Sequence, residues 1–336
     1  PPNVQDGVPD APMAALKPGE VRSYDFAPSA GTHWMHSHIP IQEMQMLAAP
    51  LIVRRPEDIA ADRQEVVMFL HDFAFKSPAE VMEEITQGHP PSGQSDMDDG
   101  GMNHEMMQGM QGDSGMAVNG MAGMEMDLND YDWDAYLAND RTLSDPEVVQ
   151  VERGGRIRLR IINAAAATVF WIDTGAAQAR LVAADGHGVQ PLSGTRFGLA
   201  MGQRLDLEMD LPNEGGAWPI LALREGAREQ TGLILATQGA DVRRIDSVAE
   251  TEAPAFDTDL AQESRLVALS ALPDRPVERS QILMLGGTMQ PYVWTINGAV
   301  WGQHHPVAAR SGERVVLSFH NMSMMAHPMH LHGHVF

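Results

Sequence analysis

Four of the chain's 14 histidines fall within one short stretch, at His327, His330, His332 and His334. Neutral imidazole is a good ligand for copper, zinc and iron. His330 and His332 are separated by one residue, so on an extended strand both side chains would leave by the same face. The stretch therefore predicts several metal ligands, although spacing alone does not say which metal they bind.

A second pair of histidines with the same spacing occurs in the run GTHWMHSH at residues 31–38. On a strand, His36 and His38 would share one face and could bind one metal ion. A pair of this kind also occurs on ordinary exposed strands. The spacing therefore leaves both interpretations open, and the surrounding residues have to decide between them.

The run HPMHLHGH at residues 327–334 resembles the HPxHLHGH motif of the multicopper oxidases, the family of laccases and periplasmic copper-resistance oxidases. In that family the matching histidines bind the type 1, type 2 and type 3 coppers in turn. The resemblance implies that His327 binds type 1 copper, His330 type 2 copper and His332 a type 3 copper. His334 matches a position that is not normally a ligand.

The run at 31–38, followed by Gln42 and by LIV at 51–53, resembles the family's second copper motif. Both of its histidines are type 3 ligands in the family, so the resemblance implies that His36 and His38 bind type 3 copper. His33 has no ligand counterpart. We expect it at the surface or behind the metal ligands.

The first nine residues, PPNVQDGVP, resemble the segment that follows the family's first motif, HWHG. In the family, an acid at the position of Asp6 lies behind the ligands of the trinuclear copper cluster and helps to move protons, which makes Asp6 the candidate catalytic residue. An Asp-Gly pair is also common in simple turns, and that alternative stays open. The first motif and the fourth, HCHxxxH, have no match. We therefore expect this chain to be an incomplete stretch of a longer oxidase and to be inactive by itself.

Composition limits what the chain can be. Its 336 residues suffice for two or three domains, and 31 Gly and 22 Pro favour many turns and short strands. A formal net charge of −22 disfavours nucleic acid and anionic membranes as partners, and no apolar run is long enough to span a membrane. Cysteine is absent, which excludes disulfides, thiol nucleophiles and the thiolate that a blue copper site requires.

Short apolar segments predict strands along most of the chain. RIRLRIIN at 156–163 alternates at first, which predicts an antiparallel strand with one face in water, and it resembles a strand of the family's middle cupredoxin domain. Further strands are expected at 21–26, 63–75, 133–139, 146–151, 181–185, 204–209, 233–237, 281–285, 292–296 and 314–319. The predicted fold class is all-β, with consecutive Greek-key cupredoxin-like β-sandwich domains.

We expect three regions in this order. Residues 1–54 are the C-terminal part of cupredoxin domain 1, residues 63–238 are domain 2, and residues 264–336 are the N-terminal part of domain 3. Domain 2 carries a Met-rich insert at 82–128 that lacks the apolar residues for a core and should be mobile. Because thioethers are soft ligands that select Cu(I), the insert is interpreted as a collector of copper. A plain disordered linker is the alternative.

The resemblance implies a copper-dependent, laccase-like oxidase with type 1, type 2 and type 3 copper sites. Such an enzyme couples the one-electron oxidation of phenols or Cu(I) to the four-electron reduction of O2 to water. The resemblance also implies a periplasmic or secreted protein, with O2 and a small reducing substrate as its partners. The sequence sets neither the substrate nor the oligomeric state.

Three other functions stay open. A copper nitrite reductase-like protein would lack a type 3 pair, so His36 and His38 count against it. A non-catalytic cupredoxin-like protein would have lost its ligands, and the five matched histidines count against that. A copper-sequestering protein that uses the Met-rich insert is compatible with oxidase activity.

Overall fold

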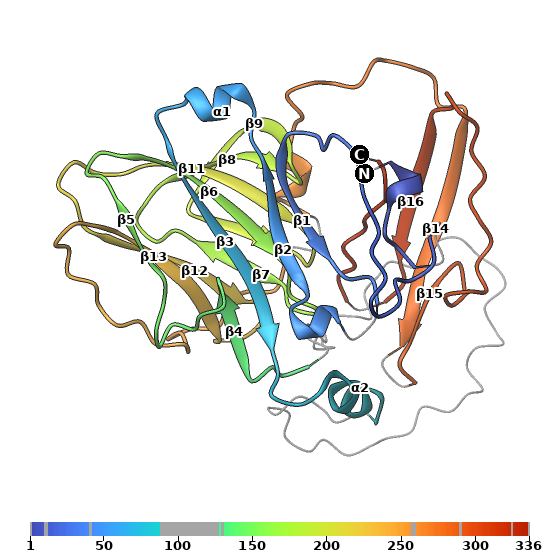
Figure 1. The fold of residues 1–336 in the computed structure, drawn as a ribbon, viewed down its shortest axis with the longest axis horizontal. Helices are drawn as coiled ribbons and strands as arrows, with labels where there is room; N and C mark the ends of the chain where they lie inside the picture. The colour runs from blue at the N-terminus through green and yellow to red at the C-terminus, as the bar shows by residue number, and fades with distance from the viewer. Residues whose placement is uncertain are drawn as a thin grey trace, which may run out of the picture.

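The structure, a computed structural model, describes residues 2–9, 13–39, 42–87, 128, 131–256, 260–288, 291–323 and 325–334. Most of the regular structure in these residues is β-strand, and the strands form the four sheets seen in Figure 1. The prediction of an all-β protein is confirmed.

The centre of the molecule is a β-sandwich of two sheets. The first has the order β4-β3-β6-β11-β8-β9 and the second the order β10-β7-β12-β13-β5. The strands of the first sheet are β3 (Gln64–Phe73), β4 (Ala135–Ala138), β6 (Arg156–Asn163), β8 (Ala179–Ala184), β9 (His187–Gly194) and β11 (Arg204–Asp210). Those of the second are β5 (Val148–Val151), β7 (Phe170–Asp173), β10 (Arg196–Leu199), β12 (Ala217–Arg224) and β13 (Gln230–Thr237).

The two sheets close on one hydrophobic core. Ile157, Leu159 and Ile161 of β6 are fully buried in it, because every second residue of a strand points to the same side. Phe170 of β7 and Leu235 of β13 reach the same core from the opposite sheet. The apolar half of the alternation in RIRLRIIN therefore packs as predicted.

The polar face of β6 differs from the prediction. β6 pairs antiparallel with β11 but parallel with β3, so it is not a purely antiparallel strand. Arg160 is fully buried, because β1 (Gly31–His36) covers it. Its guanidinium donates hydrogen bonds to Thr32 Oγ1 at 3.0 Å and to Asp206 Oδ2 at 2.8 Å. The expectation of a wet face was therefore wrong at Arg160.

The strands β1 and β2 (Ala48–Val53) form an antiparallel hairpin that lies beside the sandwich (Figure 1). Trp34 and Ile52 of the hairpin pack against Phe69 and Ile162, on the side of the six-stranded sheet that faces away from the main core. This small apolar contact holds the histidine-bearing strand against the sandwich.

A separate three-stranded sheet has the order β15-β14-β16. Its strands are β14 (Arg279–Thr288), β15 (Val293–Ile296) and β16 (Val315–Asn321), and β14 pairs parallel with β16. The N-terminal and C-terminal ends of the chain lie next to each other between this sheet and the β1–β2 hairpin (Figure 1). The two stretches that carry the predicted ligands are thus brought to one place.

Helices are few and short in the described residues: α1 (Pro56–Ala60), α2 (Pro78–Gln87) and single 3-10 turns at Asn3–Gln5, Glu43–Gln45 and Glu263–Arg265. α2 overlaps the start of the predicted insert, and it buries Val81 and Ile85 in the sandwich core. Ser77 and Glu80 cap it reciprocally, since the Ser77 amide donates to Glu80 Oε2 at 2.8 Å and the Glu80 amide to Ser77 Oγ at 3.3 Å. The prediction that the insert buries no core was wrong for its first turns.

Other predictions fare differently. The segment 21–26 forms no strand, so the strand predicted there was wrong. The Met-rich stretch from residue 88 to residue 127 lies outside the described residues, and its interpretation stays a prediction. The domain boundaries at 1–54, 63–238 and 264–336 also remain predictions.

Candidate metal centre

Four of the predicted ligands come together in a row of imidazole rings. The ring centroids of His36 and His38 are 4.5 Å apart, those of His38 and His332 are 4.8 Å apart, and those of His332 and His330 are 4.7 Å apart. Two of these residues come from the β1 end of the chain and two from the other end. We call His36, His38, His330 and His332 the four-histidine cluster.

The strand β1 and the turn after it position the first pair. β1 ends at His36, and His38 follows in a turn held by Ser37, whose amide donates to the Leu47 carbonyl at 3.1 Å. The Ser37 hydroxyl also donates to Gln42 Oε1 at 2.7 Å. His38 is therefore held by side-chain and backbone contacts of the turn, and not by a continuing strand.

The second pair lies on an irregular segment. Gly333 has a φ of +73°, the left-handed region that glycine adopts without steric cost, and the His334 amide donates to the Leu331 carbonyl at 3.2 Å. This turn places His332 at its beginning. His330 and His332 do not lie on a strand, but the turn keeps their rings next to each other.

Asp6 supports the cluster from the N-terminal segment. Its side chain is buried, and Oδ2 lies 2.8 Å from Nδ1 of His332. A carboxylate at this position accepts a hydrogen bond from Nδ1–H, so that Nε2 is the nitrogen with a free lone pair. The structure thus places Asp6 directly behind a predicted ligand, where the resemblance had put it.

His36 is surrounded differently. Its ring stacks on the indole of Trp34, with centroids 4.0 Å apart and an interplanar angle of 11°. Nδ1 of His36 is buried and has no hydrogen-bond partner among the described residues; Glu43 Oε1 lies 3.4 Å away. The sequence reasoning assigned no role to Trp34 or Glu43. Trp34 is predictable from its i, i+2 spacing to His36, which places both side chains on one face of a strand. No local pattern marks Glu43.

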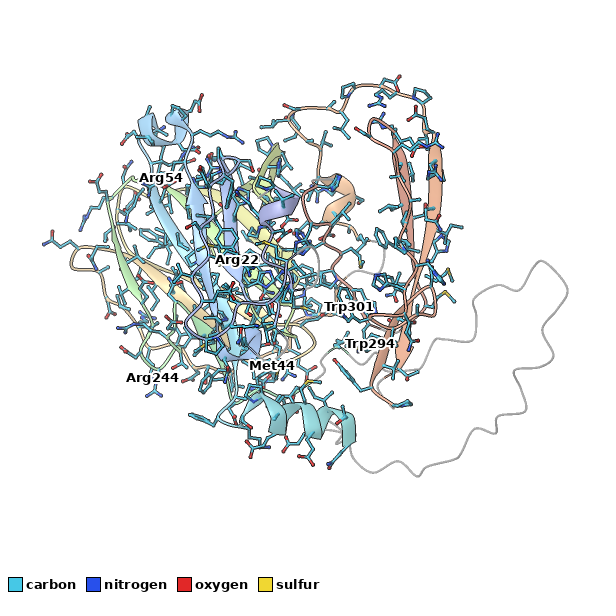
Figure 2. All side chains as sticks on the ribbon, turned by 45° about the vertical axis from the view of Figure 1, so that its right-hand side comes forward. Arg22, Met44, Arg54, Arg244, Trp294 and Trp301 are labelled. Atoms are coloured by element: carbon cyan, nitrogen blue, oxygen red, sulfur yellow. The ribbon has the colours of Figure 1, made fainter. Side chains whose placement is uncertain are left out.

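His327 lies apart from this row of rings. Its Nε2 is 2.6 Å from the Ser323 hydroxyl, and its ring meets that of Trp294 edge-on, with centroids 5.2 Å apart. Trp294, labelled in Figure 2, belongs to β15. The ring of His327 thus contacts Trp294 and Ser323, and its assignment to type 1 copper stays a prediction.

Two further histidines contact the backbone. His33 Nε2 lies 2.9 Å from the Ser29 carbonyl, and His187 Nδ1 lies 3.0 Å from the Asp185 carbonyl. Neither ring belongs to the row of rings described above. The expectation that His33 is not a ligand stays a prediction.

Local electrostatics favour neutral imidazoles in the cluster. Burial lowers the pKa of His38, and the nearby rings of His36 and His332 lower it further. Burial also lowers the pKa of His330, with a smaller contribution from His332. Burial alone lowers the pKa of His327. Because only the unprotonated ring has a lone pair to donate, these shifts favour metal binding at neutral pH.

The residues suit a copper centre in chemical type. Imidazole nitrogen is a good copper ligand, and the buried, unpartnered Nδ1 of His36 is a polar atom that protein groups leave unsatisfied. In the part of the chain that the structure describes, no three His, Asp or Glu side chains are arranged to hold one ion. The chain thus offers pairs of ligands, each of which would need further ligands to complete a site.

The chain is similar in sequence to known multicopper oxidases. Family models described as "Multicopper oxidase" match residues 1–58, 83–240 and 274–336. The chain is 31% identical to Multicopper oxidase MmcO of Mycobacterium tuberculosis, over 99% of this chain and 63% of that protein. It is 24% identical to Copper resistance protein A of Escherichia coli, over 98% of this chain and 72% of that protein.

A solved multi-copper oxidase from Pseudomonas thermotolerans has a TM-score of 0.60 to this structure at 21% identity, and the match covers 99% of this chain and 68% of that one. This similarity confirms the cupredoxin-like all-β fold. The three family models match in chain order and together include Asp6, both histidine pairs and His327. The chain belongs to the multicopper oxidase family.

Proposed function

We propose that this chain is the copper-binding stretch of an oxidase that couples the one-electron oxidation of a small reductant to the four-electron reduction of O2 to water. Copper is the cofactor of the multicopper oxidases. The chain spans 63% of the length of the Mycobacterium tuberculosis relative, so the activity of the whole protein is part of the proposal. Phenols or Cu(I) are the proposed reductants.

The observation that carries the proposal is the convergence of the four-histidine cluster. His38 and His332 come from opposite ends of the chain, yet their ring centroids are only 4.8 Å apart. Structural histidines on unrelated loops have no reason to form a continuous row of rings. A shared metal cluster gives one reason for all four positions.

Each ligand has a proposed role. His36, His38 and His332 would hold type 3 copper, His330 would hold type 2 copper, and His327 would hold type 1 copper. Bound copper supplies the one-electron redox chemistry that O2 reduction needs. His327, beside Trp294 and away from the cluster, would hold the site that receives electrons from the reductant.

Asp6 is proposed to have two functions. Its carboxylate orients His332 by accepting a hydrogen bond from Nδ1–H, and this fixes the tautomer that leaves Nε2 for the metal. It is also buried beside the cluster, where a carboxylate can accept and release protons that the reduction of O2 consumes. This second function agrees with the role that the family resemblance implies.

The other functions are less well supported. The paired rings of His36 and His38 argue against a nitrite reductase-like protein, and the retained cluster argues against a non-catalytic cupredoxin. Copper collection by the Met-rich insert is compatible with this activity. None of the helices in the described segments is long and apolar enough to cross a membrane. We infer a periplasmic or secreted location from the family.

The test is a histidine scan in the protein expressed from its full reading frame. His36→Ala and His332→Ala should each lower the bound copper and abolish O2 consumption with a phenol or Cu(I) as reductant. His334→Ala is the matched control, because this exposed histidine lies two residues from His332 and matches no ligand position. Full copper content and normal O2 consumption in His36→Ala would reject the proposal.

A further inference from the structure

Two histidines of the cluster are held by different means. Asp6 fixes the ring of His332 through a hydrogen bond to Nδ1. The corresponding nitrogen of His36 is buried without a hydrogen-bond partner among the described residues, and the carboxylate of Glu43, at 3.4 Å, forms no hydrogen bond with it. An imidazole that lacks such a bond can turn about its Cβ–Cγ bond unless packing prevents it.

The indole of Trp34 provides that packing. It lies nearly parallel to the His36 ring, with centroids 4.0 Å apart and planes 11° apart. A flat face in contact with a flat ring opposes rotation of that ring, and it occupies neither nitrogen. Stacking therefore fixes the plane of the imidazole and leaves both nitrogens for other partners.

Trp34 is itself held in place. Like Ile52 on the neighbouring strand, it packs against the buried cluster of Phe69, Ile162 and Ala164 on the six-stranded sheet. The Phe69 ring meets the indole edge-on, with centroids 6.4 Å apart. The sandwich thus holds the indole on which His36 stacks.

We propose that Trp34 is a positioning residue that orients His36 for copper, in place of the hydrogen bond that Asp6 supplies to His332. The inference rests on the proposed function, since it requires His36 to be a ligand. Trp34 itself would touch neither the metal nor the substrate. Its effect on copper must therefore pass entirely through His36.

The first experiment is a Cu(II) titration of the 336-residue chain, followed by competition with a chelator. Cu(II) is the probe because the thioethers of the Met-rich insert favour Cu(I). Trp34→Leu keeps an apolar side chain but removes the flat face, and we expect about a 10-fold loss of affinity, the lower end of the range for supporting residues. Trp34→Phe keeps a flat face and should recover most of that loss. Trp301→Leu, at an indole that is 77% exposed and contacts His304, should change nothing (Figure 2).

A double-mutant cycle separates positioning from general stability. If Trp34 acts through His36, adding Trp34→Leu to His36→Ala should cause no further loss of affinity. A merely structural tryptophan would weaken binding in both backgrounds. An equal loss in both backgrounds, or no loss from Trp34→Leu alone, would overturn the inference.

A measurement without metal tests the stacking directly. The carbon-bound ring protons of a stacked imidazole are shifted upfield by the indole ring current, so the His36 signals should move downfield in Trp34→Leu and stay unmoved in Trp301→Leu. If His36→Ala binds Cu(II) normally, the ligand assignment fails and this inference fails with it. If His36→Ala loses copper while Trp34→Leu keeps both the affinity and the His36 shifts, only the inference fails.

Discussion

Around Arg160, the two faces of the six-stranded sheet make contacts of different chemistry, although the outer face also carries the small apolar contact with Trp34 and Ile52. On one face, Ile157, Leu159 and Ile161 are fully buried in the apolar core between the two sheets. On the other, the neighbouring Arg160 is equally buried, but it bonds to charged and polar groups. Both sets of residues come from the same eight-residue strand.

The polar face is a continuous ionic network. Arg160 donates to Asp206 Oδ2 at 2.8 Å and to Glu65 Oε1 at 3.0 Å. The Thr32 hydroxyl donates to Asp206 Oδ1 at 2.5 Å and accepts from Arg160 at 3.0 Å. Arg158 ties Asp206 to Asp58 of α1, with distances of 2.9 and 2.8 Å. The network therefore links the sandwich to β1 and to the helix that follows β2.

The difference indicates that one set of contacts stabilises the sandwich and the other sets the position of β1. Apolar contact is non-directional and roughly proportional to buried area, so the core stabilises the sandwich without fixing β1. Hydrogen bonds between buried charges are directional. Because Thr32 lies four residues before His36, we expect the network to set the position of the strand that carries the cluster.

The largest effect should come from breaking the network at its centre. Arg160→Met removes the fully buried cation of the network and leaves Asp206 with Arg158 and Glu65 with the exposed Arg54; loss of one partner of a buried ion pair costs about 3–5 kcal/mol. Urea unfolding followed by tryptophan fluorescence measures the loss. Hydrogen exchange should also show that the amides of β1 lose more protection than those of β13. A loss below about 1 kcal/mol would mean that water enters and replaces the guanidinium.

A smaller effect is expected one residue away, on the apolar face. Ile161→Val removes one methylene from a fully buried side chain, and such a change typically costs about 0.5–1.5 kcal/mol. Hydrogen-exchange protection should fall evenly through the sandwich, and β1 should not be affected more than the rest. A selective loss of protection in β1 would show that the apolar core also sets the position of β1.

The smallest effect concerns pH, and it arises from His71. This residue of β3 is buried, with its ring edge-on to Phe69 at 4.8 Å between centroids, and burial lowers its pKa. Between the folded and unfolded pKa values the unfolded chain binds more protons, so this contribution to stability is present above about pH 6.5 and is lost as the pH falls below it.

The matched variant is His71→Gln, which does not titrate. The difference in unfolding free energy between it and the unchanged chain should be constant above pH 7 and should shift in favour of the variant as the solution becomes more acidic. The other histidines are present in both proteins, so their contributions cancel. A difference that does not change with pH would show that the pKa of His71 is the same in the folded and unfolded states.

The sequence by itself determined much of the sandwich and the identity of the candidate ligands. The apolar runs at 63–75 and 204–209 become β3 and β11, and 156–163 becomes β6, because alternation or continuous apolarity reports how many faces a strand buries. The cap of α2 is also encoded locally, as Ser77 followed by Pro78 and Glu80.

Only the tertiary structure decided what covers each face and what meets each histidine. A period of two distinguishes the sides of β6, but it cannot tell water from a second strand, so the burial of Arg160 beneath Thr32 was not predictable. The contacts of His332 with Asp6 and with His38 join residues from opposite ends of the chain. Contacts of this kind depend on how separate sheets pack, and local sequence patterns carry no information about that packing.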